Sequence, residues 1–421
     1  MNSPDIPLVP AIDPALDPTL DSDIPPDPLP SSAPILLRWL TLLAGVCFVV
    51  GAAGAGFLHA LAWVGRTFEA HLWLVWTLPF LGLAMTWVYA RLTPGSSGGV
   101  RTLLGQIRQP GDPLPLAMAP AIVGTTLLSH LGGASVGREG TALQMGGGLA
   151  DLLGRLGRVI GEERRTLLLC GVSAGFGAVF GTPFAAAVFA LEFVRLTAGW
   201  WYRLPLGLLC ALGADQVGRR LFGVVHGDYR LILPPVWEVA GFLGAGALGL
   251  ACGLVARFYL RWVTHNPDWK PQGLLGTPYR AIFAFGLLYV SLVCFGGLDD
   301  FTGLSLGLAQ NAAHHPMHPL VPFVKLLLTA ICVGAGFRGG EVTPLFVIGA
   351  TLGSALADYT ALPVSIAAAL GFVGVFAGAG AVPLACTVMA CEIFDPALGP
   401  LAALACGVSW LVAGRRSLYS E

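Results

Sequence analysis

The chain has 421 residues, of which 55% are hydrophobic and 11% are charged, and its formal net charge is −1. A soluble domain carries roughly 25% charged residues, so this chain lacks the polar side chains that would cover a water-facing surface. The composition therefore argues against a large soluble protein with buried helices and gives no indication of a nucleic-acid partner. It predicts an integral membrane protein.

The first segment of the chain has the composition of a disordered tail. Residues 1–34 contain ten prolines, six aspartates and no basic residue, so they cannot bury a core of their own. They also lack the basic start and the early apolar core of a signal peptide. We expect a disordered, acidic, proline-rich tail.

Long apolar runs follow, and several reach the roughly 20 residues that span the hydrocarbon core of a bilayer. The 57 glycines and 31 prolines are too many for straight helices, because helix breakers at membrane depth need neighbouring protein or a water-filled cavity around them. We therefore predict an all-α polytopic membrane protein with many tilted and broken helices. The apolar runs are Leu36–Val64, Leu72–Ala90, Pro234–Ala256, Ala281–Phe295 and Leu398–Val412.

The positions of the basic residues predict the orientation in the membrane. Four arginines crowd residues 155–165, and Arg415 and Arg416 lie near the end of the chain. Because cytoplasmic loops carry an excess of lysine and arginine, we expect both regions to be cytoplasmic. The predicted location is the cell (inner) membrane, crossed many times, with both termini in the cytoplasm.

The chain also repeats itself at a constant offset of 200 residues. We therefore predict two membrane repeats, residues 35–225 and 230–421, of inverted topology around an ion site near the bilayer midplane. Two repeat-related glutamates, Glu192 and Glu392, lie in apolar runs, and their alternative to a role in the ion path is a structural one at helix ends. The matching pairs are Arg138 and Arg338, Gly140 and Gly340, Gly171 and Gly371, Pro183 and Pro383, and the glutamates Glu192 and Glu392.

Three glycine-rich segments interrupt the apolar runs. They read PGSSGGV at 94–100, GGASVGREGT at 132–141 and GAGFRGGEVTP at 334–344. Glycine lets the backbone approach a ligand closely, and the unpaired N–H groups at a helix start favour an anion. One such loop is usually only a turn, but two of these three lie at corresponding places in the repeats. We predict an anion site here, to which the hydroxyls of Ser97 and Thr343 add donors without fixed charge.

Two carboxylates lie in the last two segments, Glu139 and Glu341. A charged carboxylate at the centre of a membrane costs roughly 2.5–3.5 kcal/mol on insertion scales, and burial favours its protonated form. Such a group can occupy an anion site as a tethered anion, or take up a proton and leave. We predict that Glu139 links anion passage to proton movement and that Glu341 relays protons or anions. The alternative for Glu139 is a salt bridge with Arg138.

The cysteines and histidines predict neither a metal site nor a cofactor. The nine cysteines lie mostly in apolar stretches without paired or metal-like spacing, as expected of small buried hydrophobic residues. His314, His315 and His318 stand beside Pro316 and Pro319, which favours an exposed loop over a metal cluster.

These motifs resemble those of the CLC family of anion channels and proton-coupled antiporters. The family's Gly-Lys/Arg-Glu-Gly-Pro motif corresponds to residues 137–141, its Gly-Ser-Gly-Ile-Pro loop to 96–100 and its Gly-Gly-x-Phe-x-Pro motif to 339–344. The resemblance covers about residues 35–421, and it leaves open whether Ser96 or Ser97 faces the anion. The anion-binding residues that it implies are Ser97, Gly340, Val342, Thr343 and Tyr419.

The departures from the family pattern resemble its bacterial fluoride-exporting branch, which exchanges fluoride for protons. Thr141 replaces a proline, and Glu341 adds a carboxylate. Val342 and Thr343 replace the usual Phe-x pair, and a hydroxyl is a better partner for small, strongly hydrated fluoride than a phenylalanine edge. Phe193 stands where chloride/proton antiporters carry an internal proton-transfer glutamate, which the fluoride branch also lacks.

The resemblance thus implies a fluoride/proton antiporter that exports fluoride from the cytoplasm by inward proton movement. The alternatives are a chloride/proton antiporter or a passive chloride channel of the same fold. A membrane-embedded hydrolase has no nucleophile–base pair to support it, so we expect a transporter and no enzyme. We also expect a homodimer in the lipid bilayer with a pathway in each subunit. Since only two residues follow Tyr419, we expect no cytoplasmic regulatory domain.

Overall fold

The computed structural model describes residues 33–93, 99–195, 199–227, 238–264, 278–414 and 417–419. Most of the predicted tail lies outside the described residues. So do Ser97, the pair Arg415 and Arg416, and residues 228–237 at the predicted junction of the two repeats. The bounds predicted for the tail and for the repeats therefore stay predictions.

The described residues are almost entirely helical, without a strand, and eight α-helices form the first half. They are α1 (Ala33–Ala70), α2 (Leu78–Leu92), α3 (Val100–Arg108), α4 (Met118–Leu131), α5 (Glu139–Leu156), α6 (Gly161–Phe180), α7 (Pro183–Val194) and α8 (Trp200–Phe222).

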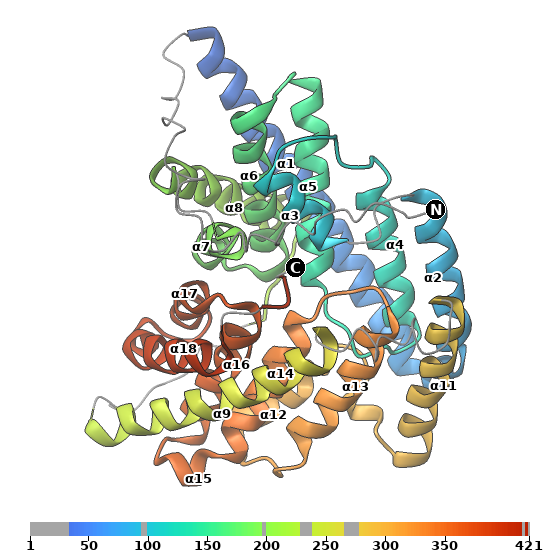
Figure 1. Ribbon diagram of the computed structural model, residues 1–421, viewed down its shortest axis with the longest axis vertical. Coiled ribbons are helices and arrows are strands. Elements are labelled where there is room, and N and C mark those ends of the chain that lie inside the picture. Colours follow the sequence, from blue (N-terminus) through green and yellow to red (C-terminus); the bar gives the residue numbers. More distant parts are fainter. Residues whose placement is uncertain are drawn as a thin grey trace, which may run out of the picture.

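The second half is also built of long and short helices, and it includes the single-turn helix α15 (Ala357–Thr360). Figure 1 shows this half, yellow to red, below most of the first, with α11 packed beside α2. Its other helices are α9 (Val239–Thr264), α11 (Pro278–Gly296), α12 (Leu306–His314), α13 (Val321–Ala335), α14 (Val342–Ala355), α16 (Val364–Gly380), α17 (Pro383–Ile393) and α18 (Gly399–Ala413).

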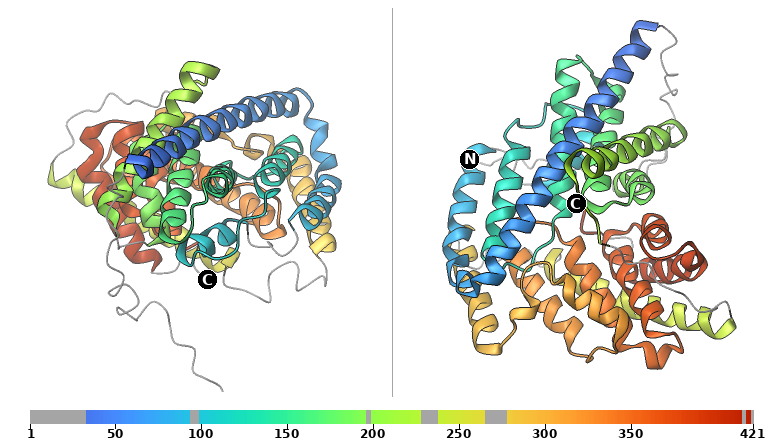
Figure 2. Two further views of the ribbon diagram at one scale, coloured as in Figure 1. Left: turned by 90° about the horizontal axis from the view of Figure 1, so that it is seen from above. Right: turned by 180° about the vertical axis from the view of Figure 1, so that it is seen from behind.

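In the part of the chain that the structure describes, five helical segments are long and apolar enough to cross a membrane, and each overlaps one of the predicted apolar runs. The first is α1, whose 38 residues extend over roughly 57 Å, against a hydrocarbon core of about 30 Å. A helix of that length crosses at a tilt, and α1 runs obliquely across the whole molecule (Figure 2). The other apolar helices have only 10–17 residues, which confirms the predicted mixture of long, tilted and short helices.

Glycines allow the central helices of each half to touch backbone to backbone. α5 packs on α6 where Gly146 meets Gly171, and α14 packs on α16 where Gly349 meets Gly371. In both pairs a Cβ atom on either glycine would collide with the backbone of the other helix. The two halves thus use the same close contact at corresponding places.

The two halves also cap each other's helices through the repeated glutamates. The Glu192 carboxylate, near the end of α7, accepts hydrogen bonds from the N–H groups of Leu384 (3.0 Å) and Ala385 (2.8 Å) in the first turn of α17. The Glu392 carboxylate at the end of α17 accepts from the first turn of α7 in the same way. Its donors are the N–H groups of Phe184 (3.2 Å) and Ala185 (2.9 Å). These residues are the repeat counterparts of Leu384 and Ala385.

This reciprocal contact gives both glutamates the structural role that the sequence left as an alternative. Pro183 and Pro383 begin the two helices, and proline is favoured there because its missing N–H would have no helical partner. The N–H groups that follow do need a partner, and the positive end of the helix dipole also favours a negative charge at the helix N-terminus.

We predict that Glu192→Gln and Glu392→Gln each lower the free energy of unfolding by about 1 kcal/mol, because the neutral amide loses the charge-assisted bonds to two N–H groups. Chemical unfolding in detergent micelles measures the change. Asp358→Asn, at an exposed carboxylate on α15, is the control and should have little effect. Equal stability of all three variants would remove this capping role.

Candidate functional site

The second and third glycine-rich segments meet at an antiparallel bridge between Gly137 and Gly340. The N–H of Gly137 donates to the Gly340 carbonyl (2.5 Å), and the N–H of Gly340 donates to the Gly137 carbonyl (2.7 Å). Helix α5 begins two residues after Gly137, and α14 begins two residues after Gly340. The bridge therefore holds the N-termini of two helices together.

Only glycine fits at this bridge. A Cβ atom on Gly340 would lie 2.7 Å from the Gly140 nitrogen and 2.8 Å from both the nitrogen and Oε2 of Glu139. A Cβ atom on Gly140 would lie 3.0 Å from the Gly339 carbonyl oxygen. The glycines that the repeat aligned, Gly140 and Gly340, are thus in direct contact across the site.

Glu139 is the first residue of α5, and its side chain is fully buried. Oε2 accepts hydrogen bonds from the backbone N–H groups of Arg138 and Thr343, both at 3.0 Å. Oε1 accepts one from the Thr343 hydroxyl. The carboxylate therefore occupies a seat of N–H and O–H donors at the start of α14.

Glu139 does not form the salt bridge with Arg138 that the sequence left as an alternative. Arg138 supplies its backbone N–H to Glu139, while its guanidinium lies over the Phe180 ring, 5.6 Å from the centroid. The donors around the Glu139 carboxylate carry no formal charge, so a neutral carboxylic acid can leave this seat without separating an ion pair.

Glu341 and Tyr419 line a cavity of about 200 Å³ next to this seat. Gly99, which directly follows the undescribed serine loop, lines it as well, together with Gly140 and Gly340. The Leu418 N–H donates to the Ala379 carbonyl (3.0 Å), which holds the segment that carries Tyr419 against α16. The cavity therefore gathers parts of all three glycine-rich regions.

Two arginines give this cavity a positive wall. Arg101 lies within electrostatic reach of Glu341 and lines the cavity with Arg338. The Arg338 guanidinium lies 3.9 Å from the centroid of the Tyr89 ring, as in a cation–π contact. An anion that enters this cavity meets positive charge before it meets Glu341.

The structure therefore places the predicted site residues in four different ways. Glu139, Gly340 and Thr343 are in direct contact, and Glu341 and Tyr419 line the adjoining cavity. The Val342 side chain is buried in the hydrophobic core, so only its backbone can face an anion. Ser97 lies outside the described residues.

Phe193 packs against Tyr419, with the ring centroids 4.6 Å apart and the rings edge to face. Phe189 stacks on Phe193 from the other side at 5.1 Å. Carbon rings carry no exchangeable proton, so this position offers no route for protons. That agrees with the departure noted in the sequence.

Sequence reasoning missed two polar groups around the site. Tyr259 on α9 is fully buried, and its hydroxyl has no hydrogen-bond partner among the described residues although it lies within electrostatic reach of Glu341 and Tyr419. Thr126 on α4 exchanges a 2.6 Å hydroxyl–hydroxyl bond with Thr141. Both residues stand in apolar helices without a motif, so no pattern marked them.

Comparisons with known proteins agree with these motifs. A family model described as voltage gated chloride channel matches residues 81–414. The chain is 40% identical over 403 residues to the "Chloride/fluoride channel protein" of Pseudomonas syringae pv. tomato, covering 92% of this chain and 86% of that protein. It is 26% identical over 354 residues to the "H(+)/Cl(-) exchange transporter ClcA" of Cronobacter sakazakii, covering 77% and 73% of the two chains.

Solved structures have the same fold. A crystal structure of a CLC-type fluoride/proton antiporter has a TM-score of 0.86 and 29% sequence identity, covering 93% of this chain and 98% of that one. A slow cyanobacterial Cl⁻/H⁺ antiporter has a TM-score of 0.75 at 21% identity, covering 91% and 96%. The predicted all-α polytopic fold is confirmed.

We predict that Gly340→Ala destabilises the protein by about 1–3 kcal/mol and abolishes ion flux, because the added methyl group must push the backbone of Glu139 and Gly140 away. Thermal unfolding in detergent and flux from proteoliposomes measure the two effects. Gly334→Ala is a matched control six residues earlier, since a Cβ atom there meets nothing within 4 Å. Similar behaviour of the two variants would show that close contact at the bridge is unimportant.

Proposed function

The chain belongs to the voltage gated chloride channel (CLC) family, and we propose that it is a fluoride/proton antiporter that exports fluoride from the cytoplasm by inward proton movement. Relatives named as a chloride/fluoride channel protein and a fluoride/proton antiporter support this assignment. The residues around Glu139 supply the chemistry of this exchange.

The observation that carries the proposal is the seat of the Glu139 carboxylate. It holds an anionic group with the N–H and hydroxyl of Thr343 at the start of α14 and the N–H of Arg138 at the start of α5, where a free anion would also be favoured. An anion can replace the carboxylate only after Glu139 has left, and protonation removes the charge that keeps it there. Each exchange of occupant is thereby tied to a proton.

The donors at this seat suit fluoride. Fluoride is small and strongly hydrated, so losing its water requires short, strong hydrogen bonds from compact donors. The Thr343 hydroxyl and N–H meet that requirement, and both are buried away from water. Glu341 in the adjoining cavity would donate a hydrogen bond to fluoride as a carboxylic acid and repel it as a carboxylate.

The second candidate within the family is a chloride/proton antiporter or a passive chloride channel. Relatives named as H(+)/Cl(-) exchange transporters favour it. Thr343 at the seat and the extra carboxylate Glu341 argue against this candidate. Phe193, which packs on Tyr419, stands where chloride/proton antiporters carry a proton-transfer glutamate and argues against it as well.

We further propose that the protein is a homodimer in the cell (inner) membrane, with both termini in the cytoplasm and no cofactor. Phe184 and Leu384, at repeat-related positions at the starts of α7 and α17, are 53% and 66% exposed. These side chains give that end of the paired helices an apolar surface, which suits burial against a second copy or lipid. Each subunit would contain its own Glu139 seat.

Flux from proteoliposomes loaded with equal fluoride and chloride tests the function, with ion electrodes outside and a pH-sensitive dye inside. We expect fluoride efflux with proton uptake and much slower chloride efflux. Equal efflux of the two halides would contradict fluoride selectivity, and fluoride efflux without proton uptake would contradict antiport.

We predict that Glu139→Gln abolishes proton coupling, because the amide keeps the shape of the carboxylate but cannot titrate. In the same assay, proton uptake should fall to background whether or not some fluoride still passes. Glu238→Gln, at an exposed carboxylate just before α9, is the control for loss of one negative charge. Continued fluoride-driven proton pumping by Glu139→Gln would falsify the role assigned here.

We also predict that Thr343→Ala lowers the ratio of fluoride to chloride flux by about 10-fold, since it removes one hydrogen bond of about 1.5 kcal/mol to the anion. Thr343→Ser keeps the hydroxyl and should retain most of the selectivity. The measured quantity is the flux ratio in mixed-halide liposomes. If the alanine and serine variants keep the same ratio, the hydroxyl does not line the path.

A further inference from the structure

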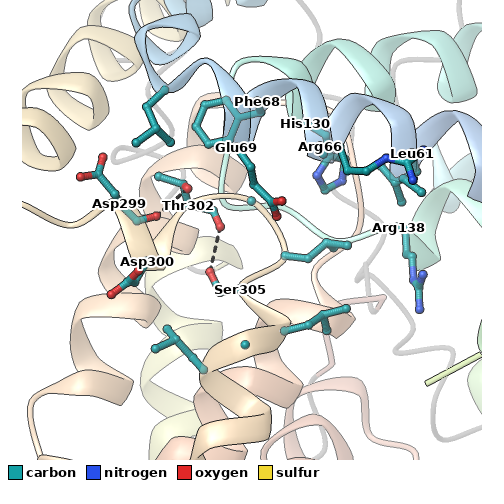
Figure 3. A pocket seen from close by; sticks show the side chains of 18 of the residues that line it. Leu61, Arg66, Phe68, Glu69, His130, Arg138, Asp299, Asp300, Thr302 and Ser305 are labelled. Carbon is teal, nitrogen blue, oxygen red and sulfur yellow. Dashed lines mark hydrogen bonds between the residues drawn. The ribbon is translucent and has the colours of Figure 1, made fainter. Parts of the chain in front are cut away.

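A second cavity, of about 660 Å³, lies between the C-terminal end of α1, the end of α4 and residues 299–311. Arg138 lines this cavity and Gly140 lines the Glu341 cavity, so Glu139 stands between the two along the chain. Figure 3 shows Arg66, His130 and Arg138 at one side of the larger cavity and two aspartates at the other. Glu139 itself lines neither cavity, so a proton from this side needs a carrier.

His130 has the geometry of such a carrier. It lies in the last turn of α4, its side chain lines the cavity, and only 5% of its surface is exposed. Its Nε2 atom is buried without a hydrogen-bond partner among the described residues. Such an orphan is rare in a folded protein, and this one belongs to a ring that lines a cavity with room for water.

The ring is also close to the Glu139 motif. It lies within electrostatic reach of the Gly137 backbone and of Arg138, the two residues before Glu139. The His130 carbonyl accepts the Gly133 N–H (3.0 Å), which fixes the turn that leads from α4 into the motif. The ring is therefore placed by the same segment that places Glu139.

The other charged groups around His130 are unsuited to pass protons inward. Arg66, Glu69, Asp299 and Asp300 are exposed at the mouth of the cavity, and arginine does not release its proton. The three carboxylates among these residues can only collect protons at the entrance. Among the described residues that line the cavity, His130 is the one buried side chain that can both accept and donate a proton.

Lys325 is the remaining ionisable group within electrostatic reach of the ring. It is fully buried on α13, and its ammonium donates to the carbonyls of Phe301 (2.9 Å) and Gly303 (2.9 Å) and to the Ser305 hydroxyl (2.8 Å). These bonds use all three of its protons and tie down the segment that forms the cavity wall. Arg138 and Lys325 are thus two basic side chains within electrostatic reach of the ring.

We propose that His130 relays protons between water in the larger cavity and Glu139. The ring accepts a proton from cavity water at one nitrogen and releases the proton already carried by the other nitrogen toward Glu139, and tautomer exchange through the cavity water then restores the starting ring. The ring ends neutral, and the Glu139 carboxylate becomes the carboxylic acid that leaves its seat. The inference rests on the proposed antiport, and it assigns the proton path on this side of the site.

The test is coupled fluoride/proton exchange in proteoliposomes for the wild type, His130→Gln, His130→Asn and His130→Ala. We expect the variants to exchange at least about 10-fold more slowly, as for loss of a general acid–base group. The number of protons per fluoride should stay unchanged in these variants because Glu139 still sets it. The exposed His318→Gln is the matched control and should exchange like the wild type.

Chemical rescue separates a relay from a structural role. Imidazole added outside should restore part of the rate of His130→Ala, since the cavity has room for it beside the truncated side chain, and should not restore His130→Gln. Slow exchange without imidazole rescue, or unchanged rates in folded variants, would overturn the relay. Absence of fluoride/proton exchange in the wild type would instead refute the proposed function.

A measurement that keeps His130 covers the case in which its variants do not fold. Diethyl pyrocarbonate acylates imidazoles, and in a variant with glutamine at the seven other histidines it should slow exchange once mass spectrometry shows that His130 is modified. Hydroxylamine, which removes the acyl group, should restore the rate. Full activity of the acylated protein, with modification of His130 verified by mass spectrometry, would also overturn the relay.

Discussion

The bridge between Gly137 and Gly340 is the constraint on which the rest of the site depends. Two backbone hydrogen bonds join the loops that begin α5 and α14, and they do so at a separation that excludes any side chain larger than hydrogen. Because the bridge fixes both helix starts, a side chain from one helix reaches the N–H groups of the other. Glu139 is that side chain, and Thr343 provides the donors.

The position of Glu139 between two cavities follows from this arrangement. The smaller cavity has a carboxylate, a tyrosine and two arginines, and the larger one has a histidine, arginines and acidic residues. Glu139 thus follows a residue that lines the larger cavity and precedes one that lines the smaller cavity, while its own carboxylate is fully buried. Phe193, packed on Tyr419, adds no titratable group beside the smaller cavity.

The sequence predicted much of this fold because membrane depth imposes simple requirements. All five long apolar segments follow from composition, and the starts of α5 and α14 follow from glycine-rich motifs before apolar runs. The contact between Glu139 and Thr343 was not predictable from residues 204 positions apart, since it depends on the register of the bridge. Tyr259, Lys325 and His130 also escaped notice. Each is a polar residue outside any recognisable motif, whose meaning appears only when its neighbours in space are known.

The mutual capping of α7 and α17 has the form of an interface between subunits. Glu192 binds the start of α17 while Glu392 binds the start of α7, so each surface contacts its own counterpart, as across the two-fold axis of a symmetric dimer. If one ancestral gene encoded a single repeat, two separate copies would have met through this contact before fusion joined them. A fused chain would keep the pairing but free its two halves to diverge, so that Glu139 would arise in one half and Thr343 in the other.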